Sequence, residues 1–423
     1  MNNSEFIFFT GGMGTILQDK GLKAGELPEK WNILKSEEVV KIHYDYIMTG
    51  CTVIETNTFG ANRLKYPEGS KPSLEEVVEA AVDNVKKAIE MSGKEGILTA
   101  LDIGPTGKLL EPLGDLKFEE AVQIFAETIK IGVKKGVDLI LIETMNDLYE
   151  AKAAVVAAKE NSDIPIWVTC VFNENSRMLI GTDPLAMVTM MEGLGVEALG
   201  LNCSLAPDKM LKTAAEFKKY SSLPVIVNPN AGVPKLEKGL TIYESTPEGF
   251  GADMKKIAET GAEILGGCCG TTPDHIGKMM DEISGLKPYK NQIKEEKRVS
   301  CSKGAIVVNE DTEISEIKDT TDKEDIIDEA YDIIGSSDIM EMNLQIPGDV
   351  TGEKELKLMQ EVLGEIQGII GMPIMFNTNH PKVLEFALRN YNGKALIRMT
   401  TGLKSYMKET EEIIKKYGGE IYK

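Results

Sequence analysis

The sequence predicts an α/β protein that opens with a (β/α)8 TIM barrel and continues into a partial (half) βα barrel. Three observations carry this prediction. Within roughly the first 290 of its 423 residues, eight short β-branched or apolar runs alternate with stretches of helical periodicity. Each run finishes in polar or glycine residues, as the rim of a parallel barrel requires. After residue 288 the texture of the sequence changes, which marks the end of the first domain.

The eight runs are expected to be the barrel strands in chain order, because an open doubly wound sheet usually has fewer strands. They read FIFFTGG, VIETNTFG, ILTALDIGP, DLILIET, PIWVTCVF, EALGLNCS, PVIVNPNAG and EILGGCCG. Between them, apolar residues recur every three or four positions at 73–91 and 118–136, which predicts helices that cover a sheet. The barrel domain is therefore assigned to residues 1–288.

The remainder of the chain is predicted to form a linker and a smaller βα domain. Alternating charges replace long apolar runs in residues 289–324, which indicates a charged linker with one short strand. Residues 325–423 contain the runs DIMEMNLQ, MPIMFNTN and KALIRMTT, separated by helical patterns, and a fourth strand is expected in KKYGGEIYK. A half-barrel leaves sheet edges that proteins usually cover, so we expect it to pack on the first barrel, form a homodimer or dock another protein.

Composition and the N-terminal sequence limit the partners and the compartment. The 47 Lys and Arg against 67 Asp and Glu give a formal net charge of −20, which disfavours nucleic acid and anionic membranes as partners. The start MNNSEFIFFTGGMGT lacks the basic segment and the apolar length of a signal peptide. No run of about 18 apolar residues occurs, so a cytoplasmic protein without a membrane partner is expected.

Three of the six cysteines fall at the ends of two predicted strands. Cys203 ends the sixth run, and the adjacent pair Cys268 and Cys269 ends the eighth. Neighbouring cysteines are poorly placed for a disulfide with each other, and clustered thiols in a reducing compartment more often bind metal or react. Zinc accepts sulfur ligands, and a catalytic zinc uses three protein ligands with a fourth position open. The alternative is that small buried thiols simply pack near the barrel rim.

Six ordered motifs make the first 290 or so residues similar to the homocysteine S-methyltransferase family. They are TGGMGT, IETNTFGAN, LIETMNDLYEA, GLNCS, NPNAG and GGCCGTTPDHI, and they resemble most closely the homocysteine module of cobalamin-dependent methionine synthase. The resemblance implies a Zn²⁺ ion held by Cys203, Cys268 and Cys269, which binds the homocysteine sulfur as a thiolate so that it can attack a methyl group. These three cysteines are therefore the expected metal ligands and catalytic residues.

The resemblance also implies roles for other rim residues. Glu143 matches a glutamate that holds the substrate ammonium group, although a rim carboxylate could instead cap a helix or pair with lysine. Asn230 matches an asparagine that can fill the fourth zinc position before substrate arrives, and its alternative is a turn asparagine. Backbone N–H groups of Gly12 and Met13 are expected to meet the substrate carboxylate. Relatives usually carry Asp where Thr10 stands, which makes substrate positioning there a departure from the family.

Asn57 and Asp102 are further substrate-binding candidates, because both lie at the ends of predicted strands. Rim polar residues more often make structural hydrogen bonds, which is the alternative for both. The three histidines and the methionine clusters are interpreted as structural.

The segment from about residue 325 resembles the early strands of a methyltetrahydrofolate-binding barrel. Relatives usually have acidic residues where Glu341, Asn343 and Asn377 lie, and only Glu341 keeps the charge. The cobalamin signature DxHxxG does not occur, so no bound cobalamin is expected on this chain, nor the usual mode of folate binding. The leading hypothesis is a zinc-dependent homocysteine methyltransferase supplied by a separate methylcorrinoid protein. The alternatives are a small donor such as S-methylmethionine, betaine or methyltetrahydrofolate, or a non-catalytic protein with structural zinc.

Overall fold

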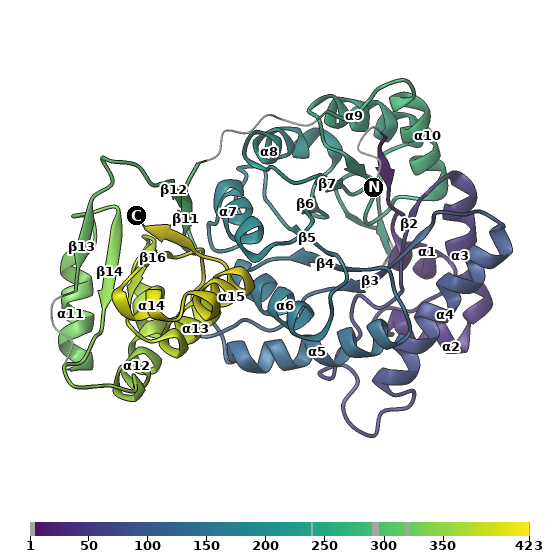
Figure 1. Cartoon of the computed structure of the whole chain (residues 1–423). Coiled ribbons are helices and arrows are strands. Elements are labelled where there is room, and N and C mark those ends of the chain that lie inside the picture. The colour runs from purple at the N-terminus through teal and green to yellow at the C-terminus, as the bar shows by residue number, and fades with distance from the viewer. Residues whose placement is uncertain (1–4, 238–239, 290–295, 318–321, 423) are drawn as a thin grey trace. The chain divides into compact units, whose positions relative to one another are not determined.

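A computed structural model (Figure 1) describes residues 5–237, 240–289, 296–317 and 322–422. Contacts divide the described residues into two compact units. The first, called the barrel unit, comprises the described parts of Met1–Gly107, Glu119–Leu179 and Glu197–Ile293. The second, called the C-terminal unit, comprises those of Lys108–Phe118, Ile180–Val196 and Lys294–Lys423.

Eight parallel strands form the sheet of the barrel unit, in the order β1-β10-β7-β6-β5-β4-β3-β2. They are β1 (Ile7–Phe8), β2 (Val53–Glu55), β3 (Leu98–Ile103), β4 (Leu139–Met145), β5 (Ile166–Cys170), β6 (Ala198–Asn202), β7 (Val225–Asn228) and β10 (Ile264–Leu265). A parallel bridge between Phe9 and Val53 joins the two ends of this order, so the sheet closes into a barrel. Each strand lies in one of the eight predicted runs, and the predicted (β/α)8 fold is confirmed.

Helices follow most of the strands and bury apolar residues. Those of the barrel unit are α1 (Met13–Asp19), α2 (Trp31–Leu34), α3 (Ser36–Thr49), α4 (Leu74–Ser92), α5 (Phe118–Lys134), α6 (Leu148–Asn161), α8 (Pro207–Tyr220), α9 (Pro247–Glu259) and α10 (Pro273–Ile283), with the 3-10 turn η1 (Pro28–Lys30). Helix α4 shows why they begin and end where they do. Ser73 and Glu76 form a reciprocal capping box, and Gly93 ends the helix at a positive φ of 64°.

The inside of the barrel is a packed core. Buried side chains from the strands meet there. The ring of Phe9, directly after β1, contacts the ring of Trp167 of β5 edge to face, with 5.7 Å between the ring centroids. Because the interior is filled by such side chains, polar chemistry is confined to the strand ends and the loops that follow them. Outside the sheet, β8 (Lys235–Glu237) and β9 (Leu240–Ile242) pair as an antiparallel hairpin.

The C-terminal unit contains a five-stranded parallel sheet whose strands pair in sequence order. Its strands are β13 (Ile314–Glu316), β14 (Ile339–Asn343), β15 (Ile374–Asn377), β16 (Leu396–Arg398) and β17 (Glu420–Tyr422), and its helices are α7 (Pro184–Leu194), α11 (Lys323–Ile333), α12 (Glu353–Ile369), α13 (Pro381–Asn390), α14 (Thr401–Ser405) and α15 (Met407–Tyr417). The parallel βα arrangement predicted for this region is confirmed.

The segment interpreted as a linker with one short strand contains three strands. Strands β11 (Arg298–Ser300) and β12 (Ala305–Val307) pair antiparallel, and β13 pairs with β14 as the first strand of the parallel sheet. These strands are three residues long and charged residues surround them, so their apolar pattern is too short to show in the sequence. Within the described residues, no helix is both long and apolar enough to cross a membrane.

Candidate metal centre

Three cysteine sulfurs meet at the carboxyl ends of the barrel strands. Cys203 follows β6, and Cys268 and Cys269 follow β10, while β7 lies between these two strands in the sheet. The three Sγ atoms lie within 4.8 Å of one another, and those of Cys268 and Cys269 are 4.0 Å apart. Among the residues that the structure describes, this is the one group of three or more His, Cys, Asp or Glu side chains with metal-site spacing.

The spacing of the sulfurs fits a tetrahedral soft cation. With Zn–S bonds of about 2.3 Å, two thiolates of a tetrahedral site lie about 3.8 Å apart. The separation of 4.0 Å between Cys268 and Cys269 is close to that value. Three thiolates would hold zinc and leave one coordination position for another ligand, so the donor set suits an open rather than a closed site.

The backbone at Cys203 adopts a conformation that is rare outside glycine. Cys203 and Ser204 have φ values of 60° and 63°, and the Cys203 N–H donates to the carbonyl oxygen of Asn228 at 2.9 Å. Non-glycine residues in the left-handed region occur mostly where the surrounding structure holds a functional group in place. This turn directs Cys203 from the end of β6 toward the sulfurs of the β10 loop.

Glycines on both sides of the cysteine pair are required by close packing. A Cβ atom on Gly267 would lie 2.3 Å from Thr271 Oγ1, and one on Gly270 would lie 2.3 Å from the ring of Tyr243. Gly270 also has a positive φ of 79°. The Cys268 N–H donates to the carbonyl oxygen of Pro229 at 2.8 Å, so the loop is fixed against β7.

Asn230 and Tyr243 support Cys269. Asn230 Oδ1 accepts a hydrogen bond from the Cys269 N–H at 3.1 Å, and the side chain is 2% exposed. Tyr243 lies close enough to Cys269 to lower the pKa of its thiol. The predicted role of Asn230 as a fourth metal ligand stays a prediction, because its side-chain oxygen is placed here on the backbone of the loop. Sequence analysis missed Tyr243, which carries no local signal of its position.

The pKa values of the cysteine thiols in this cluster differ from one another. Hydrogen bonds from Cys203 and Cys268 lower the pKa of Cys269 to about 3. Hydrogen bonds to Cys203 and Cys269, together with burial, raise the pKa of Cys268. The first thiolate of the cluster therefore forms at Cys269, and a cation is needed to bring all three sulfurs into the anionic form.

A cavity of about 340 Å³ opens beside the sulfurs and lies wholly within the barrel unit. Eight of the nine sequence-predicted site residues line it: Gly12, Met13, Asn57, Asp102, Glu143, Cys203, Cys268 and Cys269. Asn230, described above, is not among the lining residues. The wall also includes His43, Tyr46, Glu55 and Lys65, which the sequence did not single out as binding residues.

Carboxyl groups dominate one side of this cavity. Glu55, Asp102 and Glu143 come from the ends of the successive strands β2, β3 and β4. Burial and the charge of Glu143 raise the pKa of Asp102, and burial and the charge of Glu55 raise that of Glu143. Burial also raises the pKa of Glu55 to about 7, against the effect of a hydrogen bond from Thr10. The three groups repel one another as anions, so the cluster favours a cationic ligand.

Glu143 is oriented by a neighbour that sequence analysis did not assign. Asn202 Nδ2 donates to Glu143 Oε2 at 3.0 Å, and Asn202 Oδ1 accepts from the Thr144 N–H at 2.9 Å and from Thr169 Oγ1 at 2.9 Å. Asn202 is fully buried. Its place directly before Cys203 in the GLNCS motif couples the carboxylate to the cysteine loop.

Other predicted residues make structural contacts as well as lining the cavity. The Gly12 N–H donates to Thr271 Oγ1 at 3.1 Å, so this N–H group already has a partner. Asn57 Nδ2 donates to the carbonyl oxygen of Pro28 at 3.0 Å and to Asn32 Oδ1 at 2.9 Å, as its structural alternative implied. Thr10, which stands where relatives carry Asp, donates to Glu55 Oε2 at 2.6 Å. Their roles toward a substrate stay predictions.

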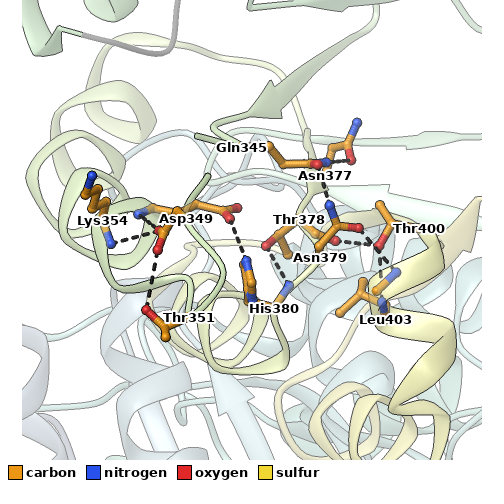
Figure 2. A network of polar contacts seen from close by, with 12 residues as sticks. Gln345, Asp349, Thr351, Lys354, Asn377, Thr378, Asn379, His380, Thr400 and Leu403 are labelled. Carbon is orange, nitrogen blue, oxygen red and sulfur yellow. Dashed lines mark hydrogen bonds and ion pairs between the residues drawn. The ribbon is translucent and has the colours of Figure 1, made fainter. Parts of the chain in front are cut away.

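The C-terminal unit has its own polar network, drawn in Figure 2. Gln345 Nε2 donates to Asn377 Oδ1 at 2.8 Å, and Asn379 Nδ2 donates to Gln345 Oε1 at 2.5 Å. Asp349 accepts from the N–H groups of Lys354 at 2.9 Å and Glu355 at 3.0 Å, and so caps α12. A second cavity of about 350 Å³ is lined by residues that include Gln345, Asp349, Glu355 and Asn379.

Glu341 is the one residue that keeps the charge of the acidic positions in folate-binding barrels. Its carboxylate already has partners in the C-terminal unit. Its carboxylate accepts from Arg398 Nη2 at 2.6 Å and from Asn377 Nδ2 at 2.7 Å. Glu341 is 3% exposed, so its charge is neutralised inside the unit rather than directed to solvent.

Comparison with known proteins shows where the barrel unit belongs. A family model described as homocysteine S-methyltransferase matches residues 7–283. The chain is 26% identical over 445 residues to a protein named methionine synthase from Mycobacterium tuberculosis, across 97% of this chain and 37% of that protein. The protein of the same name from Mycobacterium leprae is 26% identical over 457 residues, with the same coverage. The chain thus spans little more than a third of the length of these relatives.

Solved structures resemble about two thirds of the chain. The homocysteine methyltransferase MmuM from Escherichia coli, in its metallated form, matches with a TM-score of 0.56 at 20% identity and covers 66% of this chain and 96% of its own. Its apo form matches with a TM-score of 0.52 at 19% identity over the same shares. At these identities the likeness concerns the fold.

Proposed function

The chain belongs to the homocysteine S-methyltransferase family, and on this premise we propose that it transfers a methyl group to the sulfur of homocysteine and so forms methionine. The observation that carries the proposal is the trio of sulfurs at the edge of a cavity that a cluster of carboxyl groups also lines. A ligand with a thiol and an ammonium group matches both features. Homocysteine has both.

Cys203, Cys268 and Cys269 are the residues that would hold zinc, as the fit of their spacing supports. A bound zinc ion would keep the substrate sulfur in the thiolate form at neutral pH, because coordination deprotonates a thiol outright. Asn230 and Tyr243 hold Cys269 in position, and Asn202 links the cysteine loop to Glu143. These supporting contacts restrict the movement of the ligand set.

Glu143 and Asp102 receive the substrate ammonium group in this proposal. Both carboxyl groups are held in a site where burial disfavours their charge, and an ammonium partner would restore it. This contact fixes the amino acid so that its sulfur faces the cysteines. A lone pair of that sulfur forms the new S–CH3 bond, the bonding pair of the broken methyl–donor bond leaves with the donor, and the thiol proton passes to solvent.

The proposed donor is a methylcorrinoid protein. The resemblance of the barrel unit to the homocysteine module of cobalamin-dependent methionine synthase supports this choice, as does the 26% identity to proteins named methionine synthase. Small donors such as S-methylmethionine, betaine or methyltetrahydrofolate are the alternative. The proposal places the reaction in the cytoplasm, and a homodimer through the C-terminal unit stays a prediction.

A donor screen tests the proposal. Zinc-loaded protein is incubated with homocysteine and, separately, methylcobalamin, S-methylmethionine, betaine and methyltetrahydrofolate, and methionine is quantified. Formation of methionine from methylcobalamin alone, abolished by chelation and restored by zinc, is the expected result. Turnover only with a small donor would replace the corrinoid part of the proposal. An absence of methionine with every donor, with zinc X-ray absorption unchanged by homocysteine, would instead support a non-catalytic zinc protein.

A further inference from the structure

Glu55 is a half-buried residue on the cavity wall to which the proposed function gives no role. It is the last residue of β2, two positions after Val53, whose side chain lies in the core inside the barrel. Side chains two positions apart on a strand point to the same face of the sheet. The side chain of Glu55 therefore also points into the barrel, at the end of the strand where the cavity lies.

Asp102 and Glu143 follow the same rule on the next two strands. They lie two positions after Ala100 and Leu141, which also belong to the core inside the barrel. The three carboxyl groups thus form one inward-facing group at the ends of β2, β3 and β4. The charge of Glu55 contributes to the raised pKa of both other groups, as expected for a carboxyl group close to both.

Thr10 holds the carboxyl group of Glu55 in place. Thr10 Oγ1 donates to Glu55 Oε2 at 2.6 Å, and Thr10 is 4% exposed, so little water competes for its hydroxyl group. The carbonyl oxygen of Thr10 accepts from the Gly267 N–H at 3.0 Å, directly before Cys268. One residue therefore connects Glu55 to the loop that carries two of the proposed metal ligands.

The second carboxyl oxygen of Glu55 is open to the cavity. Among the described residues, no group donates a hydrogen bond to Glu55 Oε1, and this oxygen is not buried. Because Glu55 is only half-buried and lines the cavity, the space next to this oxygen is the cavity itself. Oε1 can therefore accept a hydrogen bond from a ligand without losing one from the protein.

An ammonium group has three N–H donors and can bond to three acceptors. In the proposed function, Glu143 and Asp102 account for two of them. Of the four carboxyl groups that line the cavity, that of Glu29 already accepts two hydrogen bonds from the loop after β2, and its residue is 3% exposed. Hydroxyl and amide oxygens on the wall bind a cation more weakly than a carboxylate does. The remaining carboxyl group is that of Glu55.

We propose that Glu55 is the third acceptor for the substrate ammonium group and that Thr10 is the residue that orients it. This inference rests on the proposed function, because it takes homocysteine as the substrate. Thr10 stands where relatives usually carry Asp. It has no charge of its own, but it holds the carboxylate of Glu55 beside it. Glu55 is thus a substrate-binding residue and Thr10 a positioning residue, and neither takes part in the methyl transfer.

Binding of three thiols to the zinc-loaded full chain tests the role of Glu55 without any methyl donor. Isothermal titration calorimetry at pH 8, above the Glu55 pKa of about 7, compares homocysteine with two analogues. The first, 3-aminopropane-1-thiol, has the ammonium group but no carboxylate, and the second, 4-sulfanylbutanoate, has the carboxylate but no ammonium group. In Glu55→Gln, homocysteine and 3-aminopropane-1-thiol should bind roughly 10-fold to 100-fold more weakly, because a hydrogen bond between charged groups is lost. The affinity for 4-sulfanylbutanoate should not fall, because the variant removes an anion that repels its carboxylate.

Two variants at position 10 test the positioning role. Thr10→Val removes the hydroxyl group at nearly constant volume, so the two thiols with an ammonium group should bind about threefold to 10-fold more weakly, the usual effect of one lost hydrogen bond. Thr10→Asp combined with Glu55→Gln moves the carboxylate to the neighbouring side chain. This double variant should recover most of the affinity that Glu55→Gln loses for those two thiols, and the affinity for 4-sulfanylbutanoate should not rise with it.

A matched control and the zinc content separate this role from a structural one. Glu90→Gln, at an exposed position on α4, should leave all three affinities unchanged, and every variant should keep about one zinc per chain. Equal weakening of all three thiols in Glu55→Gln, loss of its zinc, or an unchanged affinity for 3-aminopropane-1-thiol would overturn the proposal. If the expected pattern appears but no donor yields methionine, the proposed methyl transfer fails and the role of Glu55 in binding the ammonium group stands.

Discussion

Asn230 and Cys269 are joined by a hydrogen bond of 3.1 Å between the Asn230 side-chain oxygen and the Cys269 backbone N–H. The contact connects the loop after β7 to the loop after β10. A second hydrogen bond joins the same two loops, because the Ala231 N–H donates to the Cys269 carbonyl oxygen at 2.9 Å. Two hydrogen bonds therefore set the direction of a proposed metal ligand. Outer contacts of this kind tune metal affinity.

Replacing Asn230 with alanine should weaken zinc binding about 10-fold to 100-fold, because Cys269 loses its fixed orientation. Competition with a chromophoric chelator measures the affinity. Asn230→Asp, which keeps an acceptor oxygen, should lie close to wild type. X-ray absorption of the substrate-free protein addresses the other prediction: three sulfurs and one oxygen, with the oxygen lost in Asn230→Ala, would assign Asn230 as the fourth ligand.

Removing one proposed ligand should remove the metal. Cys268→Ala leaves two thiolates, which is too few for a stable catalytic zinc site. Plasma mass spectrometry should find about one zinc per chain in the wild type and well under a tenth of that in the variant. Cys301→Ala is the matched control, because Cys301 is a buried cysteine of the C-terminal unit, and it should keep its zinc. Full zinc content in Cys268→Ala would contradict the ligand assignment.

Glu143→Gln should impair recognition of the ammonium group. The carboxamide can still accept from Asn202, so the local structure is kept while the charge is lost. A hydrogen bond between charged groups is worth about 1.5–3 kcal/mol, so the KM for homocysteine should rise roughly 10-fold to 100-fold. Steady-state assays compare homocysteine with 4-sulfanylbutanoate, a thiol that has the carboxylate but lacks the ammonium group. An equal change for both thiols would show that Glu143 does not contact the ammonium group.

The stability of the protein should depend on the protonation of Glu55. Its pKa rises from 4.5 to about 7 in the folded state, so between these values the folded state holds a proton that the unfolded state has released. The contribution to the free energy of unfolding is present below pH 4.5 and is lost as the pH rises through 7, by on the order of 3 kcal/mol. Urea unfolding at pH 5, 6, 7 and 8 measures it.

The variant Glu55→Gln isolates that contribution. Its free energy of unfolding should fall less between pH 5 and pH 7 than that of the wild type, because the titrating group is absent. Glu90→Gln, at an exposed position on α4, should follow the wild-type curve. Parallel curves for wild type and Glu55→Gln would show that Glu55 titrates alike in both states.

In the C-terminal unit, Arg398→Met should be more harmful than the double change Glu341→Met with Arg398→Met. The single change leaves a buried carboxylate without its cation, at a cost of about 2–3 kcal/mol given the partial exposure of Arg398. The double change removes both charges together. Thermal unfolding compares them, with the exposed pair Lys408 and Glu412 as the control in which either change is nearly neutral.

The barrel could be predicted from the sequence because its signal is local and repeated. Each strand is a short apolar run, and each run ends in the polar residues that turn the chain at the rim, as Asn202 and Cys203 do after β6. Short strands without such a run escaped prediction. Strand β13 takes its place through pairing with β14, and that pairing depends on residues more than twenty positions away.

Within the site, residue type indicated the three cysteines of the proposed metal centre but not the residues that surround them. Two adjacent cysteines between glycines are unusual enough to be recognised wherever they lie. Tyr243 and His43, in contrast, are ordinary members of a loop and a helix, and a helical pattern shows that His43 faces inward without showing whether core or cavity lies there. Only the tertiary structure places Tyr243 on Cys269 and His43 on the cavity wall.

The three sulfurs that meet at the rim follow β6 and β10. Of the eight barrel strands, β10 comes last in the sequence and is therefore synthesised last. During synthesis, a ribosome-bound chain that has passed residue 203 but has not yet reached residue 268 contains Cys203 alone of the three. Such a chain has no complete site for the ion. With the proposed ligand set, a metal ion could bind all three sulfurs only after β10 and the loop that follows it have been synthesised, so occupancy of the site would report that the last barrel strand is in place.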